Sequence, residues 1–318
     1  MATATIHYVS SFDEVTAAET LDRAIRAKDK LQVVEVLLRA NNTQRQMIRT
    51  PYKTRYGRDM AEALKKQFSG DFEHFIVSLM HTPTKYDVLE LHSAVKGLGT
   101  NENTLIEILT TRTNEEIEAI KNTYWTTYEK KLEDVIVGDT SGDFKKLLVV
   151  LLQARRDESH NVNHGFVASD ATNMLKSLDK KSEVDKFDAF KILATASPTH
   201  VAEVLNQLER GSGKEATKLV EKEFSGDMKN LLLALIEVAR NKARFLATQL
   251  HGATKGFGTR DKDLIRVIVG RSEVDLLQIQ HEFQTLYGKS LADVVKNECK
   301  GEYRDGLLAV LRGNADRR

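Results

Sequence analysis

The sequence is short of cysteine, proline and long apolar runs, and each shortage excludes a class of protein. A single cysteine among 318 residues rules out an internal disulfide and fits a reducing compartment. Only three prolines occur, and alternating apolar and polar residues are scarce, which favours an all-helical protein. The apolar runs fall far short of the roughly 20 residues that a membrane-spanning helix needs. The first residues also lack the basic and apolar segments of a secretory signal, so we expect a cytoplasmic protein.

No excess of charge of one sign is present either. Lys and Arg together number 47 and Asp and Glu 46, which leaves a formal net charge of +1. Such a balance creates no overall field that would recruit nucleic acid or an anionic membrane. Any attachment to a negatively charged surface must therefore depend on a local feature.

What the sequence does contain is four copies of one unit. Each copy has a pentad with apolar residues on one helical face, followed by a glycine, an acidic residue and an apolar run. The pentads are Val33–Leu37, Leu105–Leu109, Ala189–Leu193 and Leu264–Ile268, and the glycines are Gly70, Gly142, Gly226 and Gly301. From the first residue of the pentad to the glycine the distance is 37 residues in every copy (33 to 70, 105 to 142, 189 to 226, 264 to 301). The repeats predict an all-α protein with about five short helices in each unit.

Several boundaries inside the repeats can also be predicted. Thr113 with Glu116 forms a capping-box pattern, and Ser197 and Ser272 stand at similar places, so each predicts a helix start. The polar segment 155–170 predicts a linker between two halves of the protein. Trp125 lies in a helical run and is expected to pack against other side chains.

Two of the repeats share a glycine-rich loop before the pentad. The loops are Lys96-Gly-Leu-Gly-Thr100 and Lys255-Gly-Phe-Gly-Thr259, and a carboxylate follows the second glycine by 40 residues in both, as Asp139 and Glu298. Glycine lets a tight loop turn its carbonyl groups inward, and carbonyl and carboxylate oxygens are ligands that Ca²⁺ prefers. Three carbonyls, from residues 95, 97 and 99 or 254, 256 and 258, with a bidentate carboxylate would leave room for water or a phosphoryl oxygen. One carboxylate does not neutralise a divalent ion, so a filled site could bridge a neutral protein to an anionic headgroup.

These loops, their carboxylates, the four repeats and stretches such as GDTSGDFKKLLVVLLQARRD resemble the annexin family over residues 12–313. The resemblance implies a calcium-dependent, phospholipid-binding protein, without enzymatic activity, whose repeats form a curved disc with the calcium loops on its convex face. It implies repeats at 12–82, 84–154, 167–240 and 243–313, of which the second and fourth keep an intact calcium loop. It places the main calcium ligands at Val95, Gly97, Gly99 and Asp139, and at Thr254, Gly256, Gly258 and Glu298. It places accessory ligands at Thr100 with Glu102 and at Thr259 with Asp261.

The first and third repeats depart from this pattern. Where the loop should lie, the first repeat reads Arg26-Ala-Lys-Asp-Lys30, and Gln67 takes the place of the carboxylate. The third repeat reads Ser177-Leu-Asp-Lys-Lys-Ser182 but keeps Glu223. We therefore expect two calcium sites rather than four.

Other interpretations stay open at this point. Lys96, Leu98, Lys255 and Phe257 could contact a membrane, or they could be solvated or locally packed. Cys299 is expected to be an inert thiol, and the pair His160 and His164 lacks further zinc ligands.

An enzyme is the competing class, but GFGTRD matches neither phosphate-binding glycine pattern, and no catalytic triad can be argued from spacing. A helical scaffold for cytoskeletal or other protein partners, without calcium, is the third interpretation. The anionic membrane remains the favoured partner.

Overall fold

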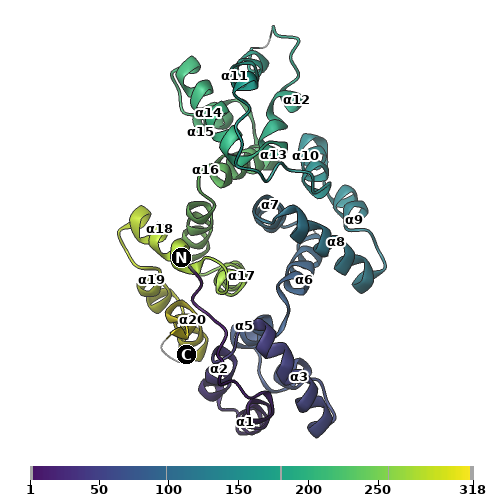
Figure 1. Ribbon diagram of the computed structural model, residues 1–318, viewed down its shortest axis with the longest axis vertical. Coiled ribbons are helices and arrows are strands. Elements are labelled where there is room, and N and C mark those ends of the chain that lie inside the picture. The colour runs from purple at the N-terminus through teal and green to yellow at the C-terminus, as the bar shows by residue number, and fades with distance from the viewer. Residues whose placement is uncertain (1–2, 98, 180, 257, 316–318) are drawn as a thin grey trace. The chain divides into compact units, whose positions relative to one another are not determined.

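The computed structural model describes residues 3–97, 99–179, 181–256 and 258–315. Every regular element in these ranges is a helix, which confirms the predicted all-α class (Figure 1). The chain divides into two compact units, Met1–Tyr86 with Leu246–Arg318, and Asp87–Phe245. The first unit thus joins the first repeat to the fourth, and the second unit joins the second repeat to the third.

Each repeat contains five helical segments, as the repeat length predicted. In the first repeat these are α1 (Glu14–Ala27), α2 (Lys30–Leu38), α3 (Asn42–Tyr56), α4 (Met60–Gln67) and α5 (Gly70–Met80). In the second they are α6 (Pro83–Val95), α7 (Glu102–Thr111), α8 (Asn114–Tyr128), α9 (Leu132–Asp139) and α10 (Gly142–Leu152). In the third they are α11 (His164–Ser177), α12 (Lys186–Phe190) with α13 (Ile192–Thr195), α14 (Pro198–Ser212), α15 (Ala216–Glu223) and the first part of α16 (Gly226–Thr254). The fourth takes the rest of α16, then α17 (Asp261–Arg271), α18 (Leu276–Tyr287), α19 (Leu291–Glu298) and α20 (Gly301–Arg312).

The repeated pentads form the core of each repeat. Val33, Leu105 and Leu264, which begin three of the pentads, are fully buried, as apolar residues on one helical face should be. In the third repeat the helix breaks at Lys191, so the pentad is divided between α12 and α13. Each landmark glycine begins the last helix of its repeat with φ between 57° and 68°, a left-handed conformation that favours glycine.

The predicted linker is shorter than expected and joins the two repeats of one unit. Helix α11 begins at His164, so only the part of segment 155–170 before that residue is irregular. The segment is held down, because Arg156 N–H donates to Asn114 Oδ1 and Asp157 N–H to Thr195 O. The interpretation that it separates two halves of the protein is therefore wrong. The unit boundaries fall within α6 and α16 instead.

Two further predictions about single residues also need correction. Trp125 on α8 is 52% exposed rather than packed, since its position falls beside, not on, the helical face that buries Ile117, Ile120 and Tyr124. Ser272 ends α17 rather than beginning α18. Its carbonyl accepts hydrogen bonds from the N–H groups of Thr5 and Ile6, so the N-terminal segment occupies the place where the helix would start. The predicted starts at Thr113 and Ser197 are confirmed.

The N-terminal segment ties the two repeats of the first unit together. It runs from α18 past α20 toward α2, in dark purple (Figure 1). Leu277 N–H donates to Thr3 O, and Asn314 N–H donates to Thr5 O. Further along, Val9 exchanges two hydrogen bonds with the side chain of Gln44 on α3. The segment is thus a structural strap rather than a free tail.

Candidate calcium sites

The glycines of the two loops adopt closely similar backbone conformations. Gly97 and Gly99 have φ of 118° and 88°, and Gly256 and Gly258 have φ of 122° and 91°. A Cβ built on any of the four would meet nothing within 4 Å, so the backbone conformation, not lack of space, calls for glycine. A backbone hydrogen bond of 2.8 Å closes each loop, from Asn101 N–H to Ala94 O or from Arg260 N–H to Ala253 O.

The structure brings each predicted carboxylate to its loop. Asp139 is the last residue of α9, and the Thr100 hydroxyl donates to the Asp139 carbonyl at 3.3 Å. Glu298 is the last residue of α19 and lines a pocket of about 310 Å³ together with Thr259 and Asp261. Both carboxylates are exposed, and no ion pair to either is found in the described ranges. Each repeat thus offers a carboxylate without a cationic partner beside a loop of backbone carbonyls.

The residues before the loops support a role for their carbonyl groups rather than their side chains. Val95 and Thr254 are both buried where α6 and α16 end. The Thr254 hydroxyl turns back to Leu250 O at 3.2 Å and His251 O at 3.1 Å. Its side chain is therefore occupied within the helix.

The accessory pairs differ between the two repeats. Thr259 donates its hydroxyl to the carboxylate of Asp261 at 2.8 Å, so these two residues already touch. In the second repeat the Thr100 hydroxyl is directed to Asp139 O instead of Glu102. The predicted membrane contacts Lys96 and Lys255 are exposed, whereas Leu98 and Phe257 lie outside the described residues.

The donor set fits calcium better than a metal that prefers nitrogen or sulfur ligands. No group of three or more His, Cys, Asp and Glu side chains gathers in a metal-binding arrangement within the described ranges. The loops offer carbonyl oxygens with one carboxylate each, which is a set for a hard cation. His160 and His164 are both exposed, and burial raises the pKa of the Cys299 thiol to about 12, so that it stays protonated.

The third repeat keeps its carboxylate but neutralises it. Glu223 Oε2 lies 3.1 Å from Lys186 Nζ, and Oε1 lies 3.1 Å from Lys222 Nζ. The two ammonium groups, that of Lys222 first, lower the pKa of Glu223. Lys186 stands three residues before the pentad, the position of Glu102 and Asp261 in the two loop-bearing repeats.

The first repeat has a lysine at the same position. Lys30 Nζ lies 3.3 Å from Glu302 Oε2 and 5.2 Å from the ring centre of Phe72. Lys186 likewise lies 5.6 Å from the ring centre of Phe224. Sequence reasoning missed these two lysines, although alignment of the pentads would have shown a lysine where the other repeats have an acid.

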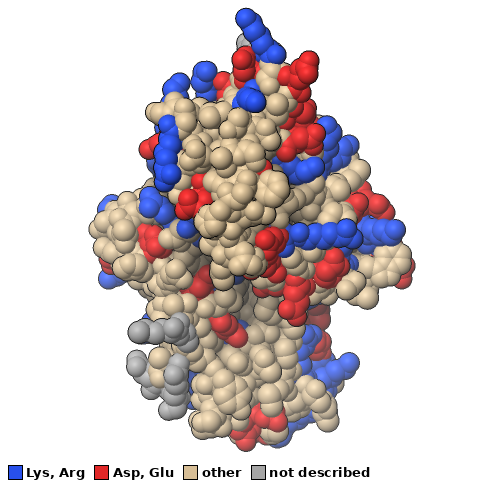
Figure 2. Space-filling model, turned by 45° about the horizontal axis from the view of Figure 1, so that its top comes forward, with Lys and Arg blue, Asp and Glu red and all other residues tan. Residues whose placement is uncertain are grey.

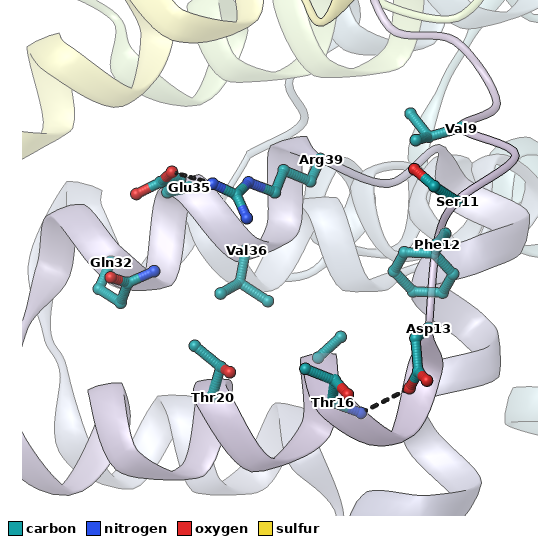
Figure 3. A pocket seen from close by; sticks show the side chains of 11 residues that line it. Val9, Ser11, Phe12, Asp13, Thr16, Thr20, Gln32, Glu35, Val36 and Arg39 are labelled. Atoms are coloured by element: carbon teal, nitrogen blue, oxygen red, sulfur yellow. Dashed lines mark hydrogen bonds and ion pairs between the residues drawn. The ribbon is translucent and has the colours of Figure 1, made fainter. Parts of the chain in front are cut away.

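A separate pocket in the first unit has both of its acidic side chains engaged in local contacts. It has a volume of about 480 Å³ and lies between the N-terminal segment, α1 and α2 (Figure 3). Its Asp13 accepts the Thr16 N–H at 2.7 Å as the cap of α1, and its Glu35 pairs with Arg39 at 2.5 Å. Asp13 therefore caps α1, and Glu35 is engaged in an ion pair at the end of α2.

Two features of the surface bear on the kind of membrane contact. Acidic and basic side chains are interspersed on the face shown in Figure 2, in keeping with the balanced composition. Within the described ranges no helix combines the length and the apolar character needed to cross a bilayer.

Comparisons with known proteins agree with these observations. The annexin family model matches residues 16–79, 86–151, 169–235 and 245–310. Annexin A5 of Gallus gallus is 40% identical over 312 residues, which cover 98% of this chain and 97% of that protein. Annexin A11 of Mus musculus is 39% identical over 312 residues, which cover 98% of this chain but 62% of the length of that longer protein.

Solved structures agree in fold as well. Annexin III has a TM-score of 0.93 at 38% identity, with 98% of this chain and 97% of that chain covered. A calcium-bound annexin (Sm)1 has a TM-score of 0.84 at 29% identity, with 98% and 93% covered. The four-repeat interpretation and the resemblance seen in the sequence are confirmed, and the chain belongs to the annexin family.

Proposed function

We propose that the protein binds calcium at the loops of its second and fourth repeats and through them attaches reversibly to anionic phospholipid membranes. The observation that carries this proposal is the pairing, in both repeats, of a left-handed glycine loop with an exposed carboxylate that no cation of the described chain neutralises. The first and third repeats lack this pairing, so we assign two sites.

The ligands of each site come from three neighbouring elements. In the second repeat they are the carbonyls of Val95, Gly97 and Gly99 with the carboxylate of Asp139. In the fourth repeat they are the carbonyls of Thr254, Gly256 and Gly258 with the carboxylate of Glu298. Thr100 with Glu102, and Thr259 with Asp261, are candidates for weaker accessory sites.

Charge balance explains why a membrane would complete such a site. One carboxylate supplies a single negative charge, so a bound Ca²⁺ would supply an uncompensated positive charge and open positions for headgroup oxygens. Lys96 and Lys255, which are exposed in the same loops, add local attraction to anionic lipid. The affinity of the protein for calcium should be weak in the absence of lipid and should rise when anionic lipid is present.

The proposal assigns a binding and membrane-organising role rather than catalysis. The acids of the pocket in the first unit are engaged in a helix cap and an ion pair, which leaves no free acid or base for chemistry there. Protein partners such as cytoskeletal components are compatible with this role.

Co-sedimentation with vesicles tests the proposal. The protein should pellet with vesicles that contain anionic phospholipid only when calcium is present, and a chelator should return it to solution. It should not bind vesicles of neutral lipid. Binding that is the same with and without calcium would favour the calcium-independent scaffold.

A further inference from the structure

A stacked pair of aromatic rings accompanies each glycine loop. The rings of His92 and Tyr128 lie 3.8 Å apart at 11°, and those of His251 and Tyr287 lie 3.8 Å apart at 14°. Each histidine stands 13 residues before the start of its pentad and each tyrosine 23 residues after it. At these positions the first repeat has Thr20 and Tyr56 and the third has Lys176 and Ser212, so neither can form the pair. The stack therefore belongs to the two loop-bearing repeats.

Two lysines lie near enough to each imidazole to lower its pKa. Burial lowers the pKa of His92, and the charges of Lys96 and Lys130 lower it further. His251 has a lowered pKa for the same reasons, with Lys255 and Lys289 as its cationic neighbours. Lys96 and Lys255 belong to the loops, whereas Lys130 and Lys289 follow the left-handed residues that end α8 and α18. The same set of three basic side chains is thus built twice.

None of these charges is balanced within the described part of the chain. Lys96, Lys130, Lys255 and Lys289 are all exposed, and no ion pair to a carboxylate is found for any of them there. By contrast, many other lysines of the chain do pair, including Lys30, Lys121, Lys146 and Lys186. The ring of His92 is held by its stack and by a 3.0 Å contact between Nδ1 and the hydroxyl of Tyr124, so Nε2 is the nitrogen left for a ligand.

We propose that these side chains form two matched subsites for the phosphate of a phosphomonoester lipid headgroup, one beside each calcium loop. The subsites consist of His92, Lys96 and Lys130, and of His251, Lys255 and Lys289. A phosphomonoester carries close to two negative charges, which two ammonium groups balance, whereas a phosphodiester carries one. Lysine binds phosphate as a point charge, and the fixed imidazole adds a directed hydrogen bond. This assignment rests on the proposed membrane function. It adds that the protein would select lipids with a phosphomonoester headgroup.

The test uses a double variant and a control that removes the same charge. Lys130→Gln with Lys289→Gln removes one lysine from each subsite and leaves the calcium ligands untouched. Lys131→Gln with Lys214→Gln is the control, because Lys131 adjoins Lys130 and Lys214 holds the equivalent position in the third repeat, which lacks the stack. All four side chains are exposed, so both variants should fold, which circular dichroism can verify.

Binding is measured at saturating calcium to phosphatidylcholine vesicles that contain either phosphatidic acid or phosphatidylglycerol, matched for surface potential. The parent protein should prefer phosphatidic acid. The subsite variant should lose about tenfold more affinity for phosphatidic acid than the control variant does, because it removes a charge-assisted contact with the phosphate from each subsite in addition to the general surface charge that both variants lose. On phosphatidylglycerol the two variants should behave alike.

Three outcomes would overturn the proposal. Equal losses for the two variants on phosphatidic acid would mean that the lysines act only as general surface charge. An equal preference of the parent for both lipids would mean that no phosphomonoester is selected, while the calcium-dependent binding itself still stands. Binding of inorganic phosphate by the parent but not by the subsite variant, with no preference of the parent for phosphatidic acid, would assign the subsites to free phosphate instead of a lipid. A parent that binds no vesicle in calcium would contradict the proposed function, which is a separate failure.

Discussion

At the scale of single residues, the position three residues before the pentad separates the two kinds of repeat. It holds Glu102 and Asp261 where a glycine loop is present, and Lys30 and Lys186 where it is not. The ammonium group of Lys186 already neutralises the carboxylate that the third repeat retains. In the third repeat a side-chain cation therefore balances the carboxylate that stays unpaired in the described part of the second and fourth repeats.

This difference predicts that Glu223→Gln leaves calcium-dependent vesicle binding unchanged. The substitution should cost less than about 1 kcal/mol of stability, because Lys222 is largely exposed and Lys186 partly exposed, and such ion pairs contribute little. Glu298→Gln is the matched control, since the same chemical change in the fourth repeat should weaken calcium binding. The two variants are compared by calorimetric titration with calcium in the presence of vesicles. If Glu223→Gln lost as much calcium affinity as Glu298→Gln, the third repeat would contain a working calcium site.

At the scale of elements, the sequence indicated where helices lie better than where they begin. The capping residues Thr113 and Ser197 were recognisable because the cap is local: a side chain accepts the N–H group three residues on. Ser272 carries the same local signal but ends a helix, because its carbonyl binds a segment more than 260 residues away in the sequence. Trp125 was misjudged because a place in a helical run does not by itself imply packing: the buried Ile117, Ile120 and Tyr124 recur at helical spacing, and Trp125 falls outside that series.

The proximity of each glycine loop to its acidic residue could be predicted because the two stand at a fixed spacing within one repeat. The lysines at 30 and 186 and the stacked rings could not be interpreted without the structure, because their meaning depends on side chains that approach from other helices.

The end of α5 gives a prediction about pH. His81 follows Met80, and burial, with the charges of Lys65, Arg49 and Lys85, lowers its pKa from 6.5 to about 4. Because the folded state holds this proton less tightly than the unfolded state, His81 favours folding above pH 6.5, and this contribution is lost as the pH falls toward 4. At pH 5 the loss should be about 1–2 kcal/mol.

Replacing His81 with Gln should remove that dependence. Urea unfolding at pH 7 and pH 5 should show a smaller fall in the free energy of unfolding for His81→Gln than for the parent. Replacement of the exposed His160 by Gln is the control and should leave the pH dependence of the parent in place. A parallel fall in the parent and in His81→Gln would mean that His81 titrates normally in the folded protein.

At the scale of the whole molecule, the repeats are grouped as first with fourth and second with third. Arg45 shows how the first unit is joined. Its guanidinium is almost completely buried, donates to the carbonyls of Leu79 and Ala40, and pairs with Glu273 of the fourth repeat at 2.7 Å. Repeat spacing alone contains no information about this pairing, because the four units are alike in sequence.

Removal of the Glu273 side chain should therefore lower the stability of the first unit only. Glu273→Ala leaves a buried cation without its counter-charge, which should cost about 2–4 kcal/mol. Hydrogen exchange should become faster in the amides of α3 and α17 and stay unchanged in α8 and α14. The exposed Glu203→Ala in the other unit is the control. Equal acceleration in both units would contradict the division into two compact units.

The central claim is that two loop-and-carboxylate sites attach the protein to membranes, and a calcium titration of vesicle binding tests it most directly. The variants are Asp139→Asn, Glu298→Gln and the double substitution, which keep side-chain size and remove the charge, with circular dichroism to verify folding. Each single variant should need about tenfold more calcium, a loss of about 1.4 kcal/mol per site. The double variant should fail to bind at calcium concentrations that saturate the parent. If the double variant bound vesicles like the parent, these two loops would not be the sites of membrane attachment.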